Sequence, residues 1–200
     1  LSLNMRKLLR ANVLVRKLLG IETSGSLNVL FTDKTGTLTE GRLQVVNVLS
    51  GDGQRFSSIN EVPEGLQNEI VFSLGNNTSA SIDLADPKNP LIVGANPTEK
   101  ALLQFLGPRL GEKDNLKMVA EIPFNSAYKF SATQVEGARS LTLVKGAAEI
   151  IIAGCTHYLD QQGKRQPIKA INTLERNMGD LADRAMRLIA LAISEKPIGD

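Results

Sequence analysis

The first forty residues combine helical and extended patterns of apolar side chains. Over residues 1–19, leucine and methionine recur at three- and four-residue spacing with arginine and lysine between them, which predicts an amphipathic helix broken near Asn12. Residues 13–15 are short enough for a strand, and residues 18–23 fit a further turn of helix. Residues 27–32 predict a buried strand, because the run is brief, rich in branched side chains and followed by a turn signal. This order is typical of a helix–strand–loop fragment of an α/β unit.

Near Gly41 the pattern changes to that of an α+β fold. An extended strand is predicted over residues 43–49 and a tight turn over residues 51–53. Residues 77–96 are polar and interrupted by two prolines, which indicates an irregular loop. An antiparallel sheet flanked by helices is predicted from helical periodicity at residues 63–76, 96–106, 150–153 and 168–186, and from strand-like runs at residues 118–123, 130–135, 140–144 and 187–193.

Composition excludes several classes of protein. The 200 residues are 42% hydrophobic and 22% charged, as in an ordinary globular protein, and the net charge of +2 is too small to argue for nucleic acid. The single Cys155 excludes an internal disulfide, and with the lone His157 it cannot build a zinc site. No stretch reaches the roughly 20 apolar residues of a membrane helix. Because the sequence begins at Leu1 and ends just after an apolar run, we expect a piece of a longer protein.

The strongest chemical signal is the run Asp33-Lys34-Thr35-Gly36-Thr37-Leu38-Thr39, which follows the predicted strand 27–32. In open α/β sheets, ligands bind where strands end. A phosphoryl group needs a nucleophile, a positive charge and donors for its oxygens, and the run supplies a carboxylate, an ammonium group, threonine hydroxyls and a glycine that permits close approach. An aspartate at a strand end is more often only a turn-former, so both interpretations stay open at this point. The chain has no Gly-x-x-x-x-Gly-Lys-Ser/Thr loop.

These seven residues resemble the phosphorylation signature of the P-type ATPases, the cation pumps that pass through an aspartyl-phosphate. The resemblance implies that Asp33 is the nucleophile and that Lys34, Thr35, Gly36 and Thr37 serve the same phosphoryl transfer. It further implies a magnesium ion touched by the Asp33 carboxylate and the Thr35 carbonyl.

Four later segments resemble the nucleotide pocket of the same family, in the same order. Asn96-Pro97-Thr98-Glu99 resembles the helix opening whose glutamate approaches adenine, and Phe124-Asn125-Ser126-Ala127-Tyr128-Lys129 resembles the segment whose aromatic ring stacks on it. Lys145-Gly146-Ala147 resembles the loop at the bottom of the pocket, and Met186-Arg187-Leu188 resembles the site of an arginine that reaches the phosphates. The implied nucleotide-binding residues are Thr98, Glu99, Phe124, Lys129, Lys145, Gly146 and Arg187. Cys155-Thr156-His157 is similar to a segment found in the calcium-pump-like branch of the P-type ATPases.

Each of these residues also has a purely structural interpretation. Phe124 could belong to the core, and Lys129 and Lys145 could be solvated charges. Thr98 could cap its helix, and Glu99 could simply favour the first helical turn. Arg187 could pair with an acidic neighbour such as Asp183. The chain also departs from the family pattern: Ala148 stands where the family usually has proline, and Tyr128 where it has arginine.

The resemblance covers nearly the whole chain and implies two domains. Residues 1–42 would hold a stalk helix and the N-terminal part of an α/β phosphorylation domain of the haloacid-dehalogenase type, and residues 43–200 an α+β nucleotide-binding domain. The implied protein is the ATP-binding cytoplasmic portion of an integral membrane pump in the cell membrane, which couples ATP hydrolysis to cation transport. Its implied partners are ATP with Mg²⁺, the transported cation, the actuator, the rest of the phosphorylation domain and the membrane helices, with no nucleic acid.

Two other functions remain open from the residues. A phosphatase of the haloacid-dehalogenase kind, with residues after Gly41 as a cap, usually carries a second aspartate two residues after the nucleophile, where this chain has Thr35. A non-catalytic nucleotide-sensing module would use only the pocket. Because no later Thr-Gly-Asp or Gly-Asp-Gly-x-Asn-Asp stretch is present, we expect this chain alone to bind ATP weakly and to turn over little or none.

Overall fold

A computed structural model describes residues 2–14, 16–83, 85–86, 90–112, 116–169 and 171–199. The chain divides into two units, residues 1–42 and residues 43–200, and each is described by itself. No helix within the described ranges is both long and apolar enough to cross a membrane.

The first unit contains two helices, α1 (Ser2–Arg10) and α2 (Leu18–Gly25). The predicted helix break is confirmed, since Asn12 adopts a left-handed φ of 58°, which ends α1. The short strand predicted over residues 13–15 is wrong for Val13 and Leu14, which belong to no element, and Val15 lies outside the described residues.

The buried strand predicted over residues 27–32 is also wrong. The segment forms no strand, and Leu30 and Phe31 are 74% and 93% exposed. A strand is stable only when a neighbour takes up its backbone N–H and C=O groups, and no described strand pairs with this segment. Residues 27–32 thus have the apolar pattern of a strand, but among the described residues they have no partner strand to bond with.

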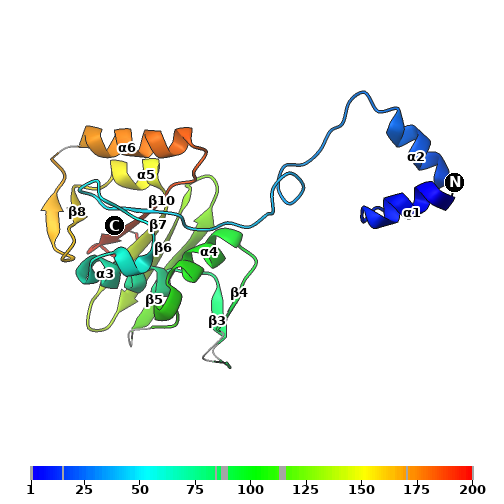
Figure 1. The fold of residues 1–200 in the computed structure, drawn as a ribbon. Coiled ribbons are helices and arrows are strands. Elements are labelled where there is room, and N and C mark those ends of the chain that lie inside the picture. Colours follow the sequence, from blue (N-terminus) through cyan, green and yellow to red (C-terminus); the bar gives the residue numbers. More distant parts are fainter. Residues whose placement is uncertain are drawn as a thin grey trace. The chain divides into compact units, whose positions relative to one another are not determined.

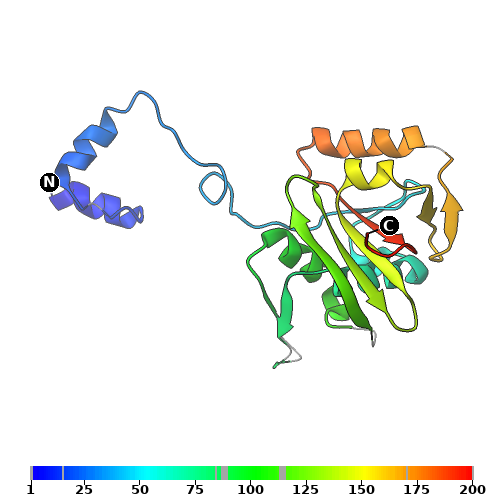
Figure 2. The same cartoon turned by 180° about the vertical axis from the view of Figure 1, so that it is seen from behind.

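The second unit is built on a four-stranded antiparallel sheet of order β10-β7-β6-β5. The strands are β5 (Lys117–Asn125), β6 (Phe130–Glu136), β7 (Leu141–Ala147) and β10 (Ile189–Ser194). In Figures 1 and 2, α5 (Ala148–Ala153) and α6 (Ile171–Asp183) lie together above the sheet, and α3 (Glu64–Asn76) lies below it. With α4 (Pro97–Phe105), these elements confirm the predicted α+β class with an antiparallel sheet.

The described residues of the second unit also form three short hairpins and the 3-10 turns Ile59–Glu61 and Gly107–Arg109. The predicted turn at residues 51–53 joins β1 (Val48–Leu49) and β2 (Arg55–Phe56), so the strand predicted over residues 43–49 is only two residues long. The predicted loop contains the hairpin of β3 (Ser81–Asp83) and β4 (Leu91–Val93), and β8 (His157–Leu159) pairs with β9 (Arg165–Pro167). Runs of two or three residues are too short to show a period of two.

Two apolar clusters position the sheet against α3. Phe72 of α3 packs with Val135 of β6 and Leu143 of β7, all less than 10% exposed. Arg139, in the β6–β7 turn, lies 4.7 Å over the Phe72 ring and pairs with Glu69 at 2.9 Å, so it covers this cluster. The larger cluster joins α3 to α4 through Ile59, Val62, Leu66, Ile70, Val71, Leu74, Leu103 and Leu106. This cluster therefore packs α3 against the C-terminal end of α4, the helix that carries Glu99.

Candidate nucleotide-binding site and phosphorylation motif

The predicted phosphorylation motif, residues 33–39, forms an exposed turn held by hydrogen bonds among its own residues. The Lys34 N–H donates to Asp33 Oδ1 at 2.7 Å, and the N–H groups of Leu38 and Thr39 donate to the Lys34 carbonyl at 3.0 and 3.2 Å. Gly36 adopts a φ of 78°, and its N–H donates to Thr39 Oγ1 at 3.3 Å. Asp33, Lys34, Thr35 and Thr37 are all exposed, so the carboxylate and the hydroxyls face solvent.

In the second unit, strand register brings several predicted nucleotide residues to one end of the sheet. Phe130 lies opposite Asn125 of β5 on one side and opposite Gly146 of β7 on the other. Phe124 is the neighbour of Asn125 and Lys129 the neighbour of Phe130, so both reach the same end of the sheet. The sequence alone could not show that these residues lie at the same end of the sheet, because their positions depend on the register of β6 with β5 and with β7.

Phe124 and Lys129 are both exposed at this end. Phe124 is 57% exposed, which excludes the core interpretation. Lys129 adopts a left-handed φ of 59° in the β5–β6 turn, and its Nζ lies 3.4 Å from Glu149 Oε1 at the protein surface. The aromatic ring of Tyr128, which stands where the family has arginine, lies 6.3 Å from that of Phe130. An exposed aromatic ring beside lysine can stack on a planar base.

Gly146 is required by packing between strands. A Cβ at this position would lie 2.3 Å from the Lys129 carbonyl oxygen and 2.6 Å from the Phe130 Cα. Both are backbone atoms, so a side chain would push β6 away from β7. Gly146 therefore keeps the Lys129 turn close to β7.

Lys145 and Glu99 form a buried ion pair. Lys145 Nζ lies 2.6 Å from Glu99 Oε2, and the two residues are 4% and 7% exposed. Lys145 Nζ also donates to the Asn77 carbonyl at 2.5 Å. Burial lowers the pKa of Lys145, while its hydrogen bond to Glu99 acts in the opposite direction. The solvated-charge interpretation thus holds for Lys129 and is wrong for Lys145, because two acceptors replace water around its ammonium group.

The start of α4 brings Thr98 close to Arg187. Asn96 Oδ1 accepts hydrogen bonds from the backbone N–H groups of Thr98 and Glu99 at 2.9 and 3.4 Å, so Asn96 is the helix cap and the prediction of Thr98 as the cap is wrong. Thr98 Oγ1 instead accepts a hydrogen bond from Arg187 Nη1 at 3.4 Å. Arg187 is exposed, and no ion pair joins it to Asp183 in the described part of the chain. A guanidinium group beside a hydroxyl is suited to binding phosphate oxygens.

Comparison with known proteins identifies the family. Residues 70–198, more than half of the chain, match the family model described as P-type ATPase, cytoplasmic domain N. The chain belongs to this family. It is 32% identical to calcium-transporting ATPase 8, plasma membrane-type, of Arabidopsis thaliana over 201 residues, which covers 96% of this chain and 18% of the relative. It is 33% identical to calcium-transporting ATPase 7, plasma membrane-type, of Oryza sativa subsp. japonica over 205 residues, which covers 98% and 20%. The chain thus spans about a fifth of the length of these relatives.

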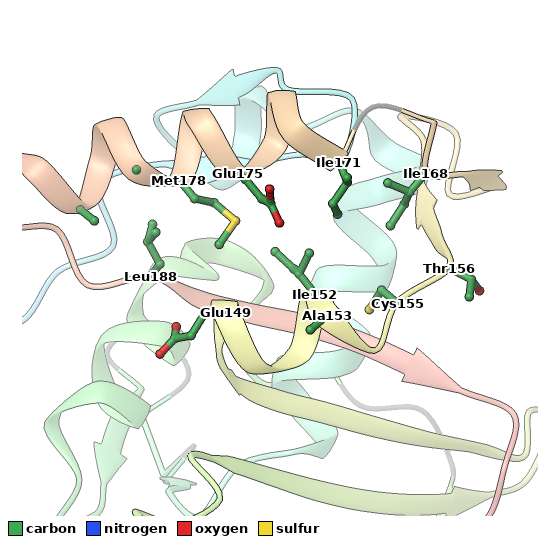
Figure 3. A pocket seen from close by; sticks show the side chains of 12 residues that line it. Glu149, Ile152, Ala153, Cys155, Thr156, Ile168, Ile171, Glu175, Met178 and Leu188 are labelled. Atoms are coloured by element: carbon green, nitrogen blue, oxygen red, sulfur yellow. The ribbon is translucent and has the colours of Figure 1, made fainter.

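In this domain N, a groove is lined by residues other than those predicted to bind nucleotide. Figure 3 shows it between α5 and α6, with Ile152 on one side and Ile171 and Met178 on the other. Its volume is about 810 Å³, and none of the predicted nucleotide residues is among the described residues that line it. Cys155 also lines the groove, and burial raises the pKa of its thiol. The groove therefore has its own lining but borders the candidate site, since Glu149, which lines it, pairs with Lys129.

The predicted motif of this P-type ATPase chain offers too few ligands to hold Mg²⁺ by itself, and it fits a site in which phosphate and water supply the other ligands. In the described part of the chain, no three His, Cys, Asp or Glu side chains gather into a group that could hold a metal ion. The Asp33 carboxylate and the Thr35 carbonyl are hard oxygen donors of the kind Mg²⁺ prefers, and Mg²⁺ commonly takes one or two carboxylates and completes its shell with phosphate and water oxygens. The donors present fit that arrangement.

Three residues of the buried network were not predicted from the sequence. Asn77, Thr78 and Ser131 are hydrogen-bonded around Lys145 and Glu99. The only available signal is Asn76-Asn77-Thr78 at a helix end, which indicates a cap or turn and not a binding site.

Proposed function

We propose that this chain is the ATP-binding portion of a cation pump of the P-type ATPase family, with ATP held by residues 43–200. The observation that supports the proposal most is the meeting of Phe124, Lys129 and the Lys145–Glu99 pair at one end of the sheet. An exposed aromatic ring, a surface ammonium group and a buried charged pair are the groups that a base and its phosphates would use. In this proposal Phe124 stacks on adenine, Glu99 and Thr98 lie toward the base, Lys129, Lys145 and Gly146 line the pocket, and Arg187 binds phosphate.

The chemistry that we propose for the intact pump takes place at Asp33. The Asp33 carboxylate attacks the γ-phosphorus of ATP, the bond to the β-phosphate oxygen breaks, and ADP leaves. Lys34 and the backbone around Thr35, Gly36 and Thr37 hold the phosphoryl oxygens. Mg²⁺, held by Asp33 and the Thr35 carbonyl, would offset the negative charge of the phosphates.

Calcium is the cation that we propose for transport, because the named relatives are calcium-transporting ATPases of the plasma membrane type. The proposal includes the remaining partners of the pump: the actuator, the rest of a haloacid-dehalogenase-like phosphorylation domain that continues residues 1–42, and the membrane helices. It also places this chain on the cytoplasmic side of the cell membrane.

An ATP titration followed by NMR tests the binding site. We expect shifts in the amides of Phe124, Lys145 and Arg187, with weaker binding by Phe124→Ala. Phe31→Ala is the matched control, since Phe31 is an even more exposed phenylalanine outside residues 43–200. No shift at these amides, or equal affinities of the two variants, would overturn the pocket assignment.

A turnover assay tests the expectation that this chain binds ATP without hydrolysing it at an appreciable rate. We expect the purified chain to bind ATP and to hydrolyse little or none. Steady-state ATP hydrolysis that is abolished by Asp33→Asn would contradict this expectation. Rapid hydrolysis of p-nitrophenyl phosphate with the same dependence on Asp33 would favour the phosphatase alternative.

A further inference from the structure

Asn77 connects three segments at the buried ion pair. It follows α3 directly and is 3% exposed. Its side-chain amide donates to the Leu143 carbonyl of β7 at 2.9 Å, and its Oδ1 accepts from Ser131 Oγ of β6 at 3.2 Å. These contacts fix the residue whose backbone carbonyl accepts a hydrogen bond from Lys145 Nζ. The carbonyl end of a helix carries partial negative charge, so this is a favourable place for an ammonium group.

Thr78 acts on the other member of the pair. Its hydroxyl donates to Glu99 Oε2 at 3.0 Å and accepts from the Ala80 N–H at 3.2 Å. The Lys145 ammonium group binds the same carboxylate oxygen, Oε2. Both donors therefore hold the same oxygen of Glu99, and no hydrogen bond to Oε1 is found among the described residues.

We infer that Asn77 and Thr78 are positioning residues of the nucleotide site, Asn77 for the Lys145 ammonium group and Thr78 for the Glu99 carboxylate. The inference rests on the proposed function. Neither residue is required to touch the nucleotide: each acts through a charged side chain whose position it fixes. Without its side chain, residue 77 loses two bonds that hold the carbonyl facing Lys145 Nζ. Without the Thr78 hydroxyl, Glu99 Oε2 loses one of the two donors that hold it. A charged group that is held less firmly in place binds its ligand less well.

ATP affinity of four variants tests the inference. Thr78→Val is expected to bind ATP about tenfold more weakly, as for the loss of one hydrogen bond to a charged group. Asn77→Ala keeps the carbonyl that accepts from Lys145 but loses the two side-chain bonds that hold this carbonyl in place, and we expect a loss of affinity of the same order. Thr78→Ser keeps the hydroxyl and should restore wild-type affinity. Thr142→Val is the matched control, because the Thr142 hydroxyl is also buried but donates to the Lys196 carbonyl, outside the network. The ATP affinity of Thr142→Val should stay within about twofold of the wild type, even if its melting temperature falls as much as that of Thr78→Val.

The side-chain NMR signal of Lys145 in the chain without ATP gives a second readout. The Cε signal should move in Thr78→Val and Asn77→Ala, and it should stay in place in Thr142→Val. Asn76→Ala is a further control, since among the described residues the Asn76 side-chain amide donates to the Phe72 carbonyl within α3 and to no member of the network. If Asn77→Ala does not fold, Ser131→Ala takes its place, because it removes the hydroxyl that donates to Asn77 Oδ1.

Two results would overturn the inference. One is ATP affinity in Thr78→Val equal to that of Thr142→Val while the wild type binds ATP. The other is a Lys145 signal that does not move in any variant of the network. A wild-type chain that fails to bind ATP would instead overturn the proposed function, and the Lys145 signal would still report whether Asn77 and Thr78 hold the pair in place.

Discussion

The turn around Asp33 and the buried pair of Lys145 and Glu99 are held in opposite ways. The hydrogen bonds of the turn join residues one to five positions apart, and all of its members are exposed. The bonds of Lys145 join residues 46 and 68 positions apart, and the pair is buried. The chemistry of the turn is therefore encoded within seven residues, whereas the pair exists only when α3, α4 and the sheet have assembled.

This difference predicts how the two regions respond to substitution. Changes in the turn should alter its chemistry and leave the unfolding of residues 43–200 unaffected, since stability is distributed unevenly along a chain. Changes at the pair or its supports should lower the free energy of unfolding.

The largest effect is expected from removing one charge of the buried pair. Lys145→Met should lower the free energy of unfolding by about 3–5 kcal/mol, because it leaves Glu99 buried without its cation. Lys34→Met, in the exposed turn, should change it by less than about 0.5 kcal/mol. Urea denaturation measures both. Equal effects of the two variants would contradict the difference between the buried pair and the exposed turn. Recovery of stability in a Glu99→Leu, Lys145→Met double variant would attribute the loss to the unpaired Glu99 carboxylate.

Two glycines provide the next test. Gly146→Ala should cost at least about 2 kcal/mol, since the added Cβ meets backbone atoms of β6 and forces the strands apart. At Gly36 an added Cβ meets nothing within 4 Å, so only the left-handed φ opposes alanine. Gly36→Ala should therefore strain the turn locally by about 1–2 kcal/mol and leave the cooperative unfolding midpoint in place. A lower midpoint in Gly36→Ala than in Gly146→Ala would contradict this order.

A local bond within the folded unit should have an intermediate effect. Asn96→Ala removes the cap of α4 and should cost about 1 kcal/mol in thermal unfolding. Thr98→Val leaves that cap in place and should cost less than about 0.5 kcal/mol. Asp33→Ala also removes one local bond, but from the exposed turn, so it should leave the transition unchanged. A cost of Thr98→Val as large as that of Asn96→Ala would contradict the assignment of the cap.

The smallest effect concerns the acid stability of a local turn in residues 43–200. Hydrogen bonds from the Gln166 side chain and from the Lys164 and Gln162 N–H groups lower the pKa of Asp160 below its ordinary value. A lowered pKa contributes stability that is present above the ordinary value and is lost as pH falls through the folded value. The wild type should therefore lose its advantage over Asp160→Asn below about pH 4. Parallel profiles of melting temperature against pH for the two proteins would contradict this.

Much of the fold followed from periodic patterns, and the errors share a cause. The helix at residues 63–76 and the four sheet strands were predicted because each is long enough to show a period. The hairpins at residues 81–93 and 157–167 were missed because strands of three residues have none. Residues 27–32 have the apolar pattern of a buried strand and remain exposed, since a pattern states what a segment could bury and not whether a partner strand is there.

The candidate site divides in the same way. The motif from Asp33 to Thr39 could be read from the sequence, because its chemistry belongs to residue types at short spacing. The exposure of Phe124 could not, and only the structure excluded a place in the core. That Lys145 is buried, that Asn77 and Thr78 hold it and Glu99, and that Asn96 caps α4 were decided by tertiary structure. Burial and partnership across 46 or 68 positions depend on strand register and helix packing, which no local pattern contains.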